Sequence, residues 1–316
     1  MNIKIEPLHN KYVDDAVKLV IKAYHEERKS LQALPQYDFT SILKKKIINL
    51  FSKGSGVVTL NGNEVVGFLA GFEVEEFFGK CKGVYCPVYG HGTGQKYSTE
   101  IYQKMYQHTA DMWVKKSLFN HAITLFAHDD NLIDTWFWLG FGLRCIDAIR
   151  EVAPICENNT AFHIKKTAIC DIPSLTEIYK KHNVYYRTSP LFMPNQDKDP
   201  IKDLTDWLEK ENHHMWTAYS QEKPIGFMRI QPNAESYVSE YEKMMNITGA
   251  YVEENSRRSH IGTLLLDAIQ RWLLENKYSL CGVDYESFNI LGSSFWEKYF
   301  TPYTYNVVRR IDERIV

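Results

Sequence analysis

The chain runs through the same succession of structural patterns twice, and this repetition constrains its fold more than any other feature. Each half begins with a short alternating strand pattern, at residues 2–6 and 162–166, which precedes a helical segment with acidic residues at its start. Landmarks of three kinds recur at nearly the same spacing of 161, 159 and 160 residues, namely Ile3 with Ile164, Gly67 with Gly226, and Trp136 with Trp296. Such agreement over half a chain indicates an internal duplication.

In each half, the strand and helix patterns predict the order strand, two helices, three strands, helix, strand, helix, strand. An alternation of this kind is typical of an α/β layer protein with a mixed sheet. Between the halves, the polar stretch 153–160 contains Pro154 and paired asparagines, as linkers do. We therefore predict two tandem domains, at residues 1–153 and 160–316.

Composition excludes several classes of protein. The formal charge is −2 and no basic block exceeds Lys44–Lys46, which argues against a nucleic-acid partner. The N-terminus is charged, and the apolar run 136–143 is too short to cross a bilayer, so we expect no membrane partner. The six cysteines are widely spaced and are expected to be reduced thiols, which predicts a cytoplasmic location. His213 and His214 are adjacent and have no third ligand nearby, so no metal site is expected.

The most informative segment is residues 247–263. A strand pattern ends at Val252, a polar loop follows, and Gly262 begins an amphipathic helix. Free amides at a helix N-terminus favour a phosphate group, and glycine allows a close backbone approach. Arg257 and Arg258 add charge suited to a pyrophosphate, and we prefer this interpretation to the alternative of a solvated loop.

This segment resembles the pyrophosphate loop of the acyl-CoA N-acyltransferase (GNAT) superfamily, written Arg/Gln-x-x-Gly-x-Gly/Ala. Arg257 and Gly262 match, while His260 stands where the family has its middle glycine. Residues 289–298 are also similar to the family's Asn-x-x-Ala-x-x-Phe-Tyr-Glu-Lys segment. The resemblance implies two tandem GNAT-like domains, with acetyl-CoA or another acyl-CoA bound in the second.

The resemblance also assigns roles to residues of the second half. The pantetheine arm is expected along the backbone of Ala250, Tyr251 and Val252. The phosphates are expected at the loop and helix start, which comprise Arg257, Arg258, Ser259, His260, Ile261, Gly262 and Thr263. Asn289 is expected to contact the cofactor arm, or alternatively to cap the helix that follows it.

The catalytic groups depart from the family pattern. A tyrosine on the last helix often protonates the leaving sulfur in this family, but tryptophan occupies that position in both halves, at Trp136 and Trp296. Tyr299, Tyr285 or water is then the candidate acid. The candidate bases are Glu253, Asp284 and Glu286, with surface or capping roles as the alternative. The aromatic stretch 185–193 is expected either to shape the acceptor pocket or to pack in the core.

The first half lacks the arginine pattern. Its glycine-rich counterpart, residues 84–96, fits neither a P-loop nor a dinucleotide fingerprint, and we interpret it as a structural turn or part of a substrate pocket. Asp129 stands where the second half has Asn289. We therefore expect the first half to be a divergent copy without its own acyl-CoA.

The sequence thus predicts an N-acyltransferase that moves an acetyl group from acetyl-CoA to an amine of a small molecule or peptide. The alternative is a non-catalytic acyl-CoA-binding or sensor protein. A third possibility, an aminoacyl-transfer protein of the same fold, is disfavoured by the acidic charge balance. The expected state is a monomer or homodimer.

Overall fold

The computed structural model describes residues 3–94, 98–155, 162–194 and 198–315, which fall into two compact units. The first unit comprises residues up to 147 together with 236–238 and 302–316, and the second comprises 148–235 and 239–301. This division departs from the expected limits 1–153 and 160–316 chiefly at the last strand of the chain. Residues 156–160 of the expected linker lie outside the described residues.

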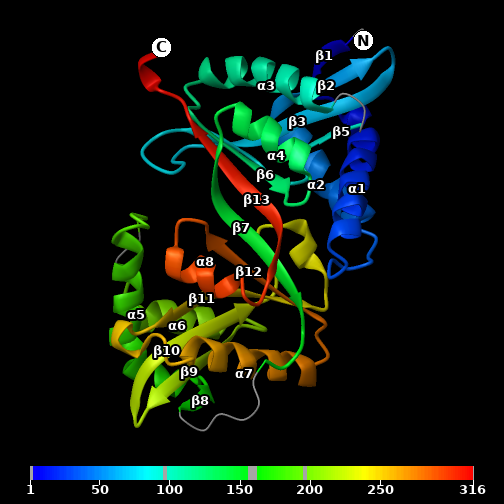
Figure 1. Cartoon of the computed structure of the whole chain (residues 1–316). Coiled ribbons are helices and arrows are strands. Elements are labelled where there is room, and N and C mark those ends of the chain that lie inside the picture. The colour runs from blue at the N-terminus through cyan, green and yellow to red at the C-terminus, as the bar shows by residue number, and fades with distance from the viewer. Residues whose placement is uncertain (1–2, 95–97, 156–161, 195–197, 316) are drawn as a thin grey trace. The chain divides into compact units, whose positions relative to one another are not determined.

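The first unit is built around a sheet with the strand order β1-β2-β3-β4-β6-β13, and β5 pairs with β3 (Figure 1). Its elements are β1 (Ile3–Pro7), α1 (Val13–Ser30), α2 (Thr40–Lys53), β2 (Ser55–Asn61), β3 (Glu64–Val74), β4 (Gly83–Cys86), β5 (His91–Thr93), α3 (Ser98–Val114), β6 (Asn120–Phe126), α4 (Asp130–Trp138) and the start of β7 (Gly142–Glu151). The β2–β3 hairpin turns at Gly62, whose φ of 61° suits glycine, as the sequence predicts.

The last strand of the chain, β13 (Thr301–Arg310), completes the sheet of the first unit. It pairs antiparallel with β6 from Thr304 opposite Phe126 to Arg310 opposite Asn120. This pairing gives β6 hydrogen-bond partners along an edge that would otherwise be open. The end of β7 belongs to the second unit, where the Val152 amide donates to the Ser279 carbonyl over 2.9 Å. The terminal strands of the two repeats are therefore not confined to the halves that contain them in sequence.

The second unit contains β8 (His163–Lys166), α5 (Ile172–Arg187), α6 (Pro200–Leu208), β9 (His214–Ser220), β10 (Lys223–Gln231), β11 (Met244–Val252), α7 (Ile261–Glu275), β12 (Leu280–Glu286) and α8 (Ile290–Trp296). Its strands follow the order β12-β11-β10-β9-β8. The β11–β12 pair is parallel and the other pairs are antiparallel, so the predicted mixed sheet is confirmed. The succession of elements matches the predicted order, except that α8 is shorter than expected and ends before Tyr299.

Helices cover both faces of the sheet in the second unit (Figure 1). On one face, α5 and α6 pack through Tyr179 and Leu204 against Met215 and Phe227 of the central hairpin. On the other, Trp272 of α7 lies 5.6 Å from Trp216, the neighbour of Met215. Because side chains alternate along a strand and both faces are covered, the central residues of β9 and β10 are buried.

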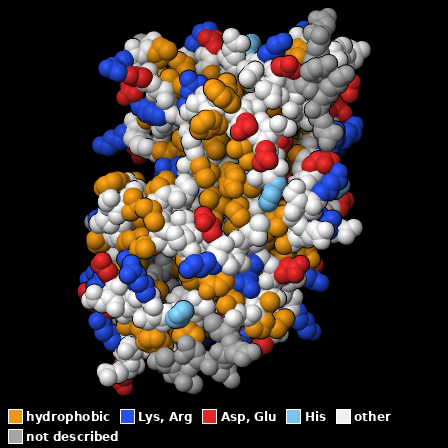
Figure 2. All heavy atoms as spheres, viewed as in Figure 1, with side chains coloured by type: hydrophobic (Ala, Val, Ile, Leu, Met, Phe, Trp, Pro, Cys, Tyr) orange, Lys and Arg blue, Asp and Glu red, His pale blue; other side chains and the backbone are white. Residues whose placement is uncertain are grey.

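Two further features concern helix ends and the surface. Asp171 occupies the N-cap position of α5, while its carboxylate accepts from the Ala168 amide and from Lys165 and not from an amide of the first turn of α5. None of the described helices combines the length and apolar composition needed to cross a bilayer. On the face drawn in Figure 2, basic and acidic side chains are intermixed.

The packing of α7 can be tested with two leucines of the same helix. Leu265 is fully buried, whereas Leu274 is 52% exposed. We expect Leu265→Ala to lower the free energy of unfolding by about 2–5 kcal/mol, since it leaves a cavity against the sheet. Leu274→Ala, the matched control, should cost less than about 0.5–1 kcal/mol. Urea unfolding measures both; equal losses would contradict this packing.

Candidate functional site

The two central strands of the second unit separate partway along their length. β11 pairs with β12 only from Met244 opposite Leu280 to Ile247 opposite Val283, although both strands continue further. Met244 to Ile247 are buried, and the rest of β11, residues 248–252, is partly exposed. Residues 248–252 therefore have a backbone edge that no ladder bond to β12 occupies.

A β-bulge lies at the point of separation. Arg229 of β10 pairs with Gly249, and the next residue, Ile230, pairs with Ile247, so Thr248 is an extra residue in β11. A bulge bends its strand and changes the direction of its backbone groups. The antiparallel ladder to β10 then continues to Val252, which keeps this outer segment extended while its other edge stays open.

The predicted phosphate loop connects this edge to the N-terminus of α7. A short 3-10 turn, Glu254–Ser256, follows β11, and α7 begins at Ile261. His260 has a φ of 62° and a ψ of 10°, the left-handed conformation that glycine adopts most easily. The histidine that replaces the family's middle glycine therefore keeps a backbone shape typical of glycine. The first amides of α7 have no intrahelical acceptor and point out of the helix start.

Gly262 and Thr263 connect α7 to α8. A Cβ at Gly262 would come within 3.1 Å of the Phe295 ring, so a bulky side chain there would displace that ring. The Thr263 hydroxyl lies 2.9 Å from the Tyr299 hydroxyl. Tyr299, a candidate acid, is thus held at the first turn of α7, at the phosphate end of the site.

Arg257 lies against the open edge of β11. Its Nε donates to the Val252 carbonyl over 3.2 Å, and its guanidinium carbon is 5.2 Å from the Tyr185 ring centre and 5.8 Å from that of Tyr251. The side chain therefore lies within the site rather than in a solvated loop. Arg258, whose φ is 64°, is the second left-handed residue of this loop.

Asn289 caps α8 and also contacts α5. Its Oδ1 accepts from the Gly292 amide at 3.2 Å and from the Tyr185 hydroxyl at 2.7 Å. The capping alternative therefore describes its contacts in this structure. Tyr185 and Tyr186 belong to α5, Leu191 is buried and Phe192 is 73% exposed, so the aromatic stretch 185–193 serves different roles along its length.

Glu253 is poorly suited to act as a base. Its carboxylate forms an ion pair with Lys181 and a longer one, at 3.4 Å, with Lys223. The hydrogen bond from Lys181 is the main cause that lowers the pKa of Glu253 below its usual value. A carboxylate with a lowered pKa is a weaker proton acceptor at neutral pH. This geometry disfavours Glu253 among the predicted bases, and the pairing with Lys181 has no local sequence signal.

The other candidates lie on β12 beyond its pairing with β11. Tyr285 is two residues past Val283 and is 3% exposed. Asp284 and Glu286 flank it in sequence and, by strand alternation, point to the opposite face. Continuing the register from Ile247 and Val283 brings Tyr285 level with Gly249, immediately after the bulge.

The first unit repeats this architecture but fills the corresponding space. β4 pairs with β6 from Gly83–Asn120 to Cys86–Ile123, and Ile123 corresponds to Val283 at the repeat spacing of 160. One residue beyond, the Thr124 carbonyl accepts from His91 Nε2 over 2.8 Å. A carbonyl only accepts, so Nε2 carries the proton and Nδ1 accepts from the Tyr102 hydroxyl, 2.9 Å away.

His91 is a structural residue of the first unit. It is 5% exposed, and burial lowers its pKa to about 4, so it is neutral at pH 7. The ring joins β5 to β6 at the level where the strands of the second unit part. Trp136 is fully buried in the same core, and Asp129 caps α4 through the Leu132 amide at 3.0 Å. Gln95 and Lys96 of the glycine-rich segment lie outside the described residues.

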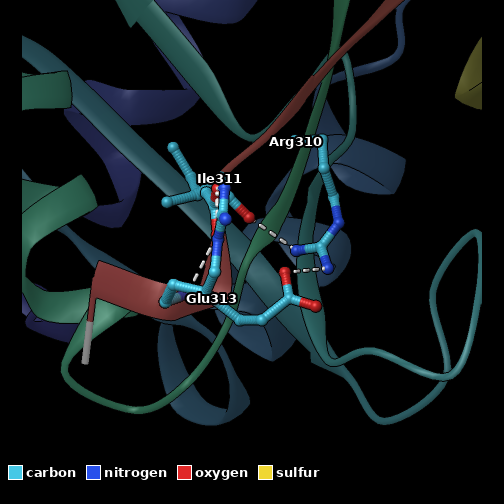
Figure 3. A pocket seen from close by; sticks show the side chains of 5 residues that line it. Arg310, Ile311 and Glu313 are labelled. Atoms are coloured by element: carbon cyan, nitrogen blue, oxygen red, sulfur yellow. Dashed lines mark hydrogen bonds and ion pairs between the residues drawn. The ribbon is translucent and has the colours of Figure 1, made fainter.

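A surface hollow at the C-terminal segment does not form a comparable site. It is lined by five consecutive residues, Arg310, Ile311, Asp312, Glu313 and Arg314. Figure 3 shows the Arg310 guanidinium meeting the Glu313 carboxylate, and Arg314 pairs with Asp312. These charges neutralise one another, and every lining residue comes from one segment.

The comparisons with known proteins agree with this geometry. Residues 175–289 match the model of the acetyltransferase (GNAT) family. The second unit therefore contains a GNAT acetyltransferase domain. The matched residues include β9–β12 and the loop before α7, and thus the features described above for the site of the second unit, except α8 and Tyr299.

Solved structures share the GNAT fold with the chain. A GCN5-related N-acetyltransferase from Sphaerobacter thermophilus is 10% identical, with a TM-score of 0.62, over 98% of this chain and 95% of that one. A tandem GNAT protein from the clavulanic acid biosynthesis pathway is 11% identical, with a TM-score of 0.52, over 98% of both chains. At this identity the likeness concerns the fold alone. No curated protein matches the chain in sequence.

The left-handed backbone of His260 makes a prediction about its substitution. His260→Gly should retain CoA affinity within about threefold and leave stability unchanged or raised by up to about 1 kcal/mol, since glycine adopts this conformation without strain. His260→Val should lose roughly 1–2 kcal/mol, because a β-branched residue is disfavoured there. Thermal unfolding and calorimetric CoA titration measure both variants. A valine variant as stable as the glycine variant would contradict the assignment.

Proposed function

We propose that the second unit is an N-acyltransferase that moves an acetyl group from acetyl-CoA to the amine of a small molecule or peptide. The observation that carries this proposal is the separation of β11 from β12 after Ile247, next to the N-terminus of α7. An open strand edge offers backbone hydrogen bonds to an extended amide-bearing arm, and a helix N-terminus offers amides to phosphates. Acyl-CoA combines these two chemical features in one molecule.

The described residues fit this cofactor. The backbone of Ala250, Tyr251 and Val252 would pair with the pantetheine amides, as an added strand does. The amides of Ile261, Gly262 and Thr263 would hold the pyrophosphate, with Ser259 and His260 shaping the loop. Arg257 and Arg258 would supply charge-assisted hydrogen bonds to phosphate. Asn289 would act indirectly, by holding α8 and Tyr185 in place through its hydrogen bonds.

The bound acyl-CoA would supply an activated thioester, and the protein would orient it and move protons. Backbone amides after the bulge at Thr248 would polarise a carbonyl group lying along β11. Tyr285, level with Gly249, is our candidate for protonating the departing sulfur. Tyr299 is held by Thr263 and positions the first turn of α7 instead. Asp284 and Glu286 are the candidate groups that accept the proton of the incoming ammonium.

A non-catalytic acyl-CoA sensor is the second candidate. Trp296 favours it, because this residue occupies the family's acid position and is buried between Phe295 and Phe300, with ring centres 4.8 and 5.6 Å away. An indole N–H is not a practical acid. Thiol release from acetyl-CoA across a panel of amines separates the two functions, since a sensor would bind CoA without releasing thiol. A cytoplasmic location and a monomeric or homodimeric state stay predictions.

The phosphate site predicts a loss of cofactor affinity in an arginine variant. The double variant Arg257→Ala/Arg258→Ala should weaken CoA binding by about 1–3 kcal/mol, roughly 5- to 150-fold, because charge-assisted hydrogen bonds are removed. Arg271→Ala on the exposed side of α7 is the matched control and should bind CoA normally. Calorimetric titration decides the outcome, and wild-type affinity in the double variant would overturn the phosphate assignment.

The proposed acid can be separated from its neighbour by two matched substitutions. Tyr285→Phe should lower kcat about 10²-fold with unchanged CoA affinity, because only the proton donor is lost. Tyr299→Phe should keep kcat within about threefold. Steady-state thiol release measures both rates. An unaffected Tyr285→Phe would assign the proton transfer to water, and a large loss in Tyr299→Phe alone would mean that the two roles are reversed.

A further inference from the structure

Arg229 is a charged residue between the apolar residues Met228 and Ile230 of β10. It lies on β10 opposite Gly249, and its side chain crosses that glycine, where a Cβ would come within 2.6 Å of its Nε. The absence of a side chain at position 249 therefore lets the guanidinium lie over the strand that carries the bulge. In sequence, a lone arginine between Met228 and Ile230 is the signal that could have identified it.

The charge of Arg229 has few partners, and one of them is the Tyr179 hydroxyl of α5, which forms a side-chain hydrogen bond with it. One guanidinium nitrogen donates to the Thr248 carbonyl over 3.4 Å, and the guanidinium carbon lies 5.0 Å from the centre of the Trp207 ring. Its Nε is buried without a hydrogen-bond partner. Within the part of the chain that the structure describes, no carboxylate forms an ion pair with it. Asp203, on the neighbouring helix, is bound instead by the Tyr179 hydroxyl at 2.6 Å and by Lys198 at 3.5 Å.

The surroundings hold this side chain in place. Trp207 donates its indole N–H to the Gln231 side chain over 3.1 Å, and the Thr248 hydroxyl donates to the same oxygen over 3.2 Å. The Trp207 ring and the bulge at Thr248 are thus connected through the side-chain amide of Gln231. Burial of a guanidinium without an anion is unfavourable, so a fixed arginine with an unused donor is suited to bind an anion from outside.

Groups of opposite charge lie across the gap between the strands. Asp284 and Glu286 follow the last paired residue of β12; Asp284 is exposed, Glu286 is half-buried, and both lie close enough to Tyr186 of α5 to affect its pKa. All three charged groups affect the pKa of Tyr186 in α5. Burial is the main cause that raises its pKa, both carboxylates raise it further, and Arg229 lowers it. A positive group and two negative groups therefore lie around Tyr186, and the positive one adjoins the bulge at Thr248.

We propose that the amine acceptor is a small amino acid whose carboxylate binds Arg229 while its ammonium group faces Asp284 and Glu286. This inference rests on the proposed acyl transfer and assigns its substrate class. A carboxylate can take two parallel hydrogen bonds from a guanidinium, including the one that Nε does not make within the protein. Its ammonium group would then lie between the two carboxylates and the open end of β11, where acylation is proposed to occur.

The test uses the full-length protein saturated with CoA and a panel of free amino acids, each paired with its amide. Calorimetric titration should find at least one acid that binds tenfold or more tightly than its amide, because only the acid presents a carboxylate to Arg229. Arg229→Gln should reduce this ratio to within about threefold, and Arg229→Lys should retain part of it. Arg271→Gln, the matched control, should leave the ratio unchanged.

Two results would overturn the proposal. No acid could bind more tightly than its amide, or the ratio could survive in Arg229→Gln. Unchanged CoA affinity and thermal stability of that variant exclude general damage to the fold. Thiol release from acetyl-CoA with the same compounds tests acyl transfer separately. Binding through Arg229 without thiol release would refute the proposed function while leaving the carboxylate site intact.

Discussion

The structure of the second unit depends on how far β11 and β12 stay hydrogen-bonded to each other. Parallel pairing over Met244 to Ile247 closes the buried part of the sheet, and its absence beyond Ile247 leaves an open backbone edge. The bulge at Thr248 and the continued ladder to β10 keep that edge extended. Because the loop after Val252 leads directly into α7, the same separation brings the edge and a helix N-terminus together. The proposed cofactor site and the proposed carboxylate site at Arg229 both lie next to the open edge of β11.

The two halves show how one architecture can keep or lose such an opening. In both, the parallel pairing stops at corresponding residues, Ile123 and Val283. In the first unit a buried, neutral His91 then bonds to the Thr124 carbonyl and to Tyr102. The bond to Thr124 uses a carbonyl of β6, the counterpart of β12, and so connects β5 to β6 where β11 and β12 of the second unit are not bonded to each other. This interpretation agrees with the missing arginine pattern and explains physically why we propose one acyl-CoA site, in the second unit.

Much of the fold follows from local patterns, and much of the site chemistry does not. Alternating strands, the turn at Gly62 and the repeat spacing predict the order of elements, since each depends on neighbours in sequence. The pairing of β13 with β6 could not be predicted, because alternation does not specify which edge a strand joins. The engagement of Glu253 by Lys181, and the position of Arg229 over Gly249, likewise depend on contacts between distant segments. His260 looks like a departure from the family in sequence, yet its backbone keeps the shape typical of glycine.

The central claim is that acyl-CoA lies along the open edge of β11 and not in the first unit. Hydrogen–deuterium exchange of the full-length protein, measured with and without saturating CoA, tests it most directly. The account predicts that CoA slows exchange of the backbone amides of Ala250 and Val252, which face the open edge, and of residues 261–263, since these would become hydrogen-bonded to the cofactor. Exchange at residues 91–93 of the first unit should not change. Slower exchange at residues 91–93, with none at 249–252, would contradict the account.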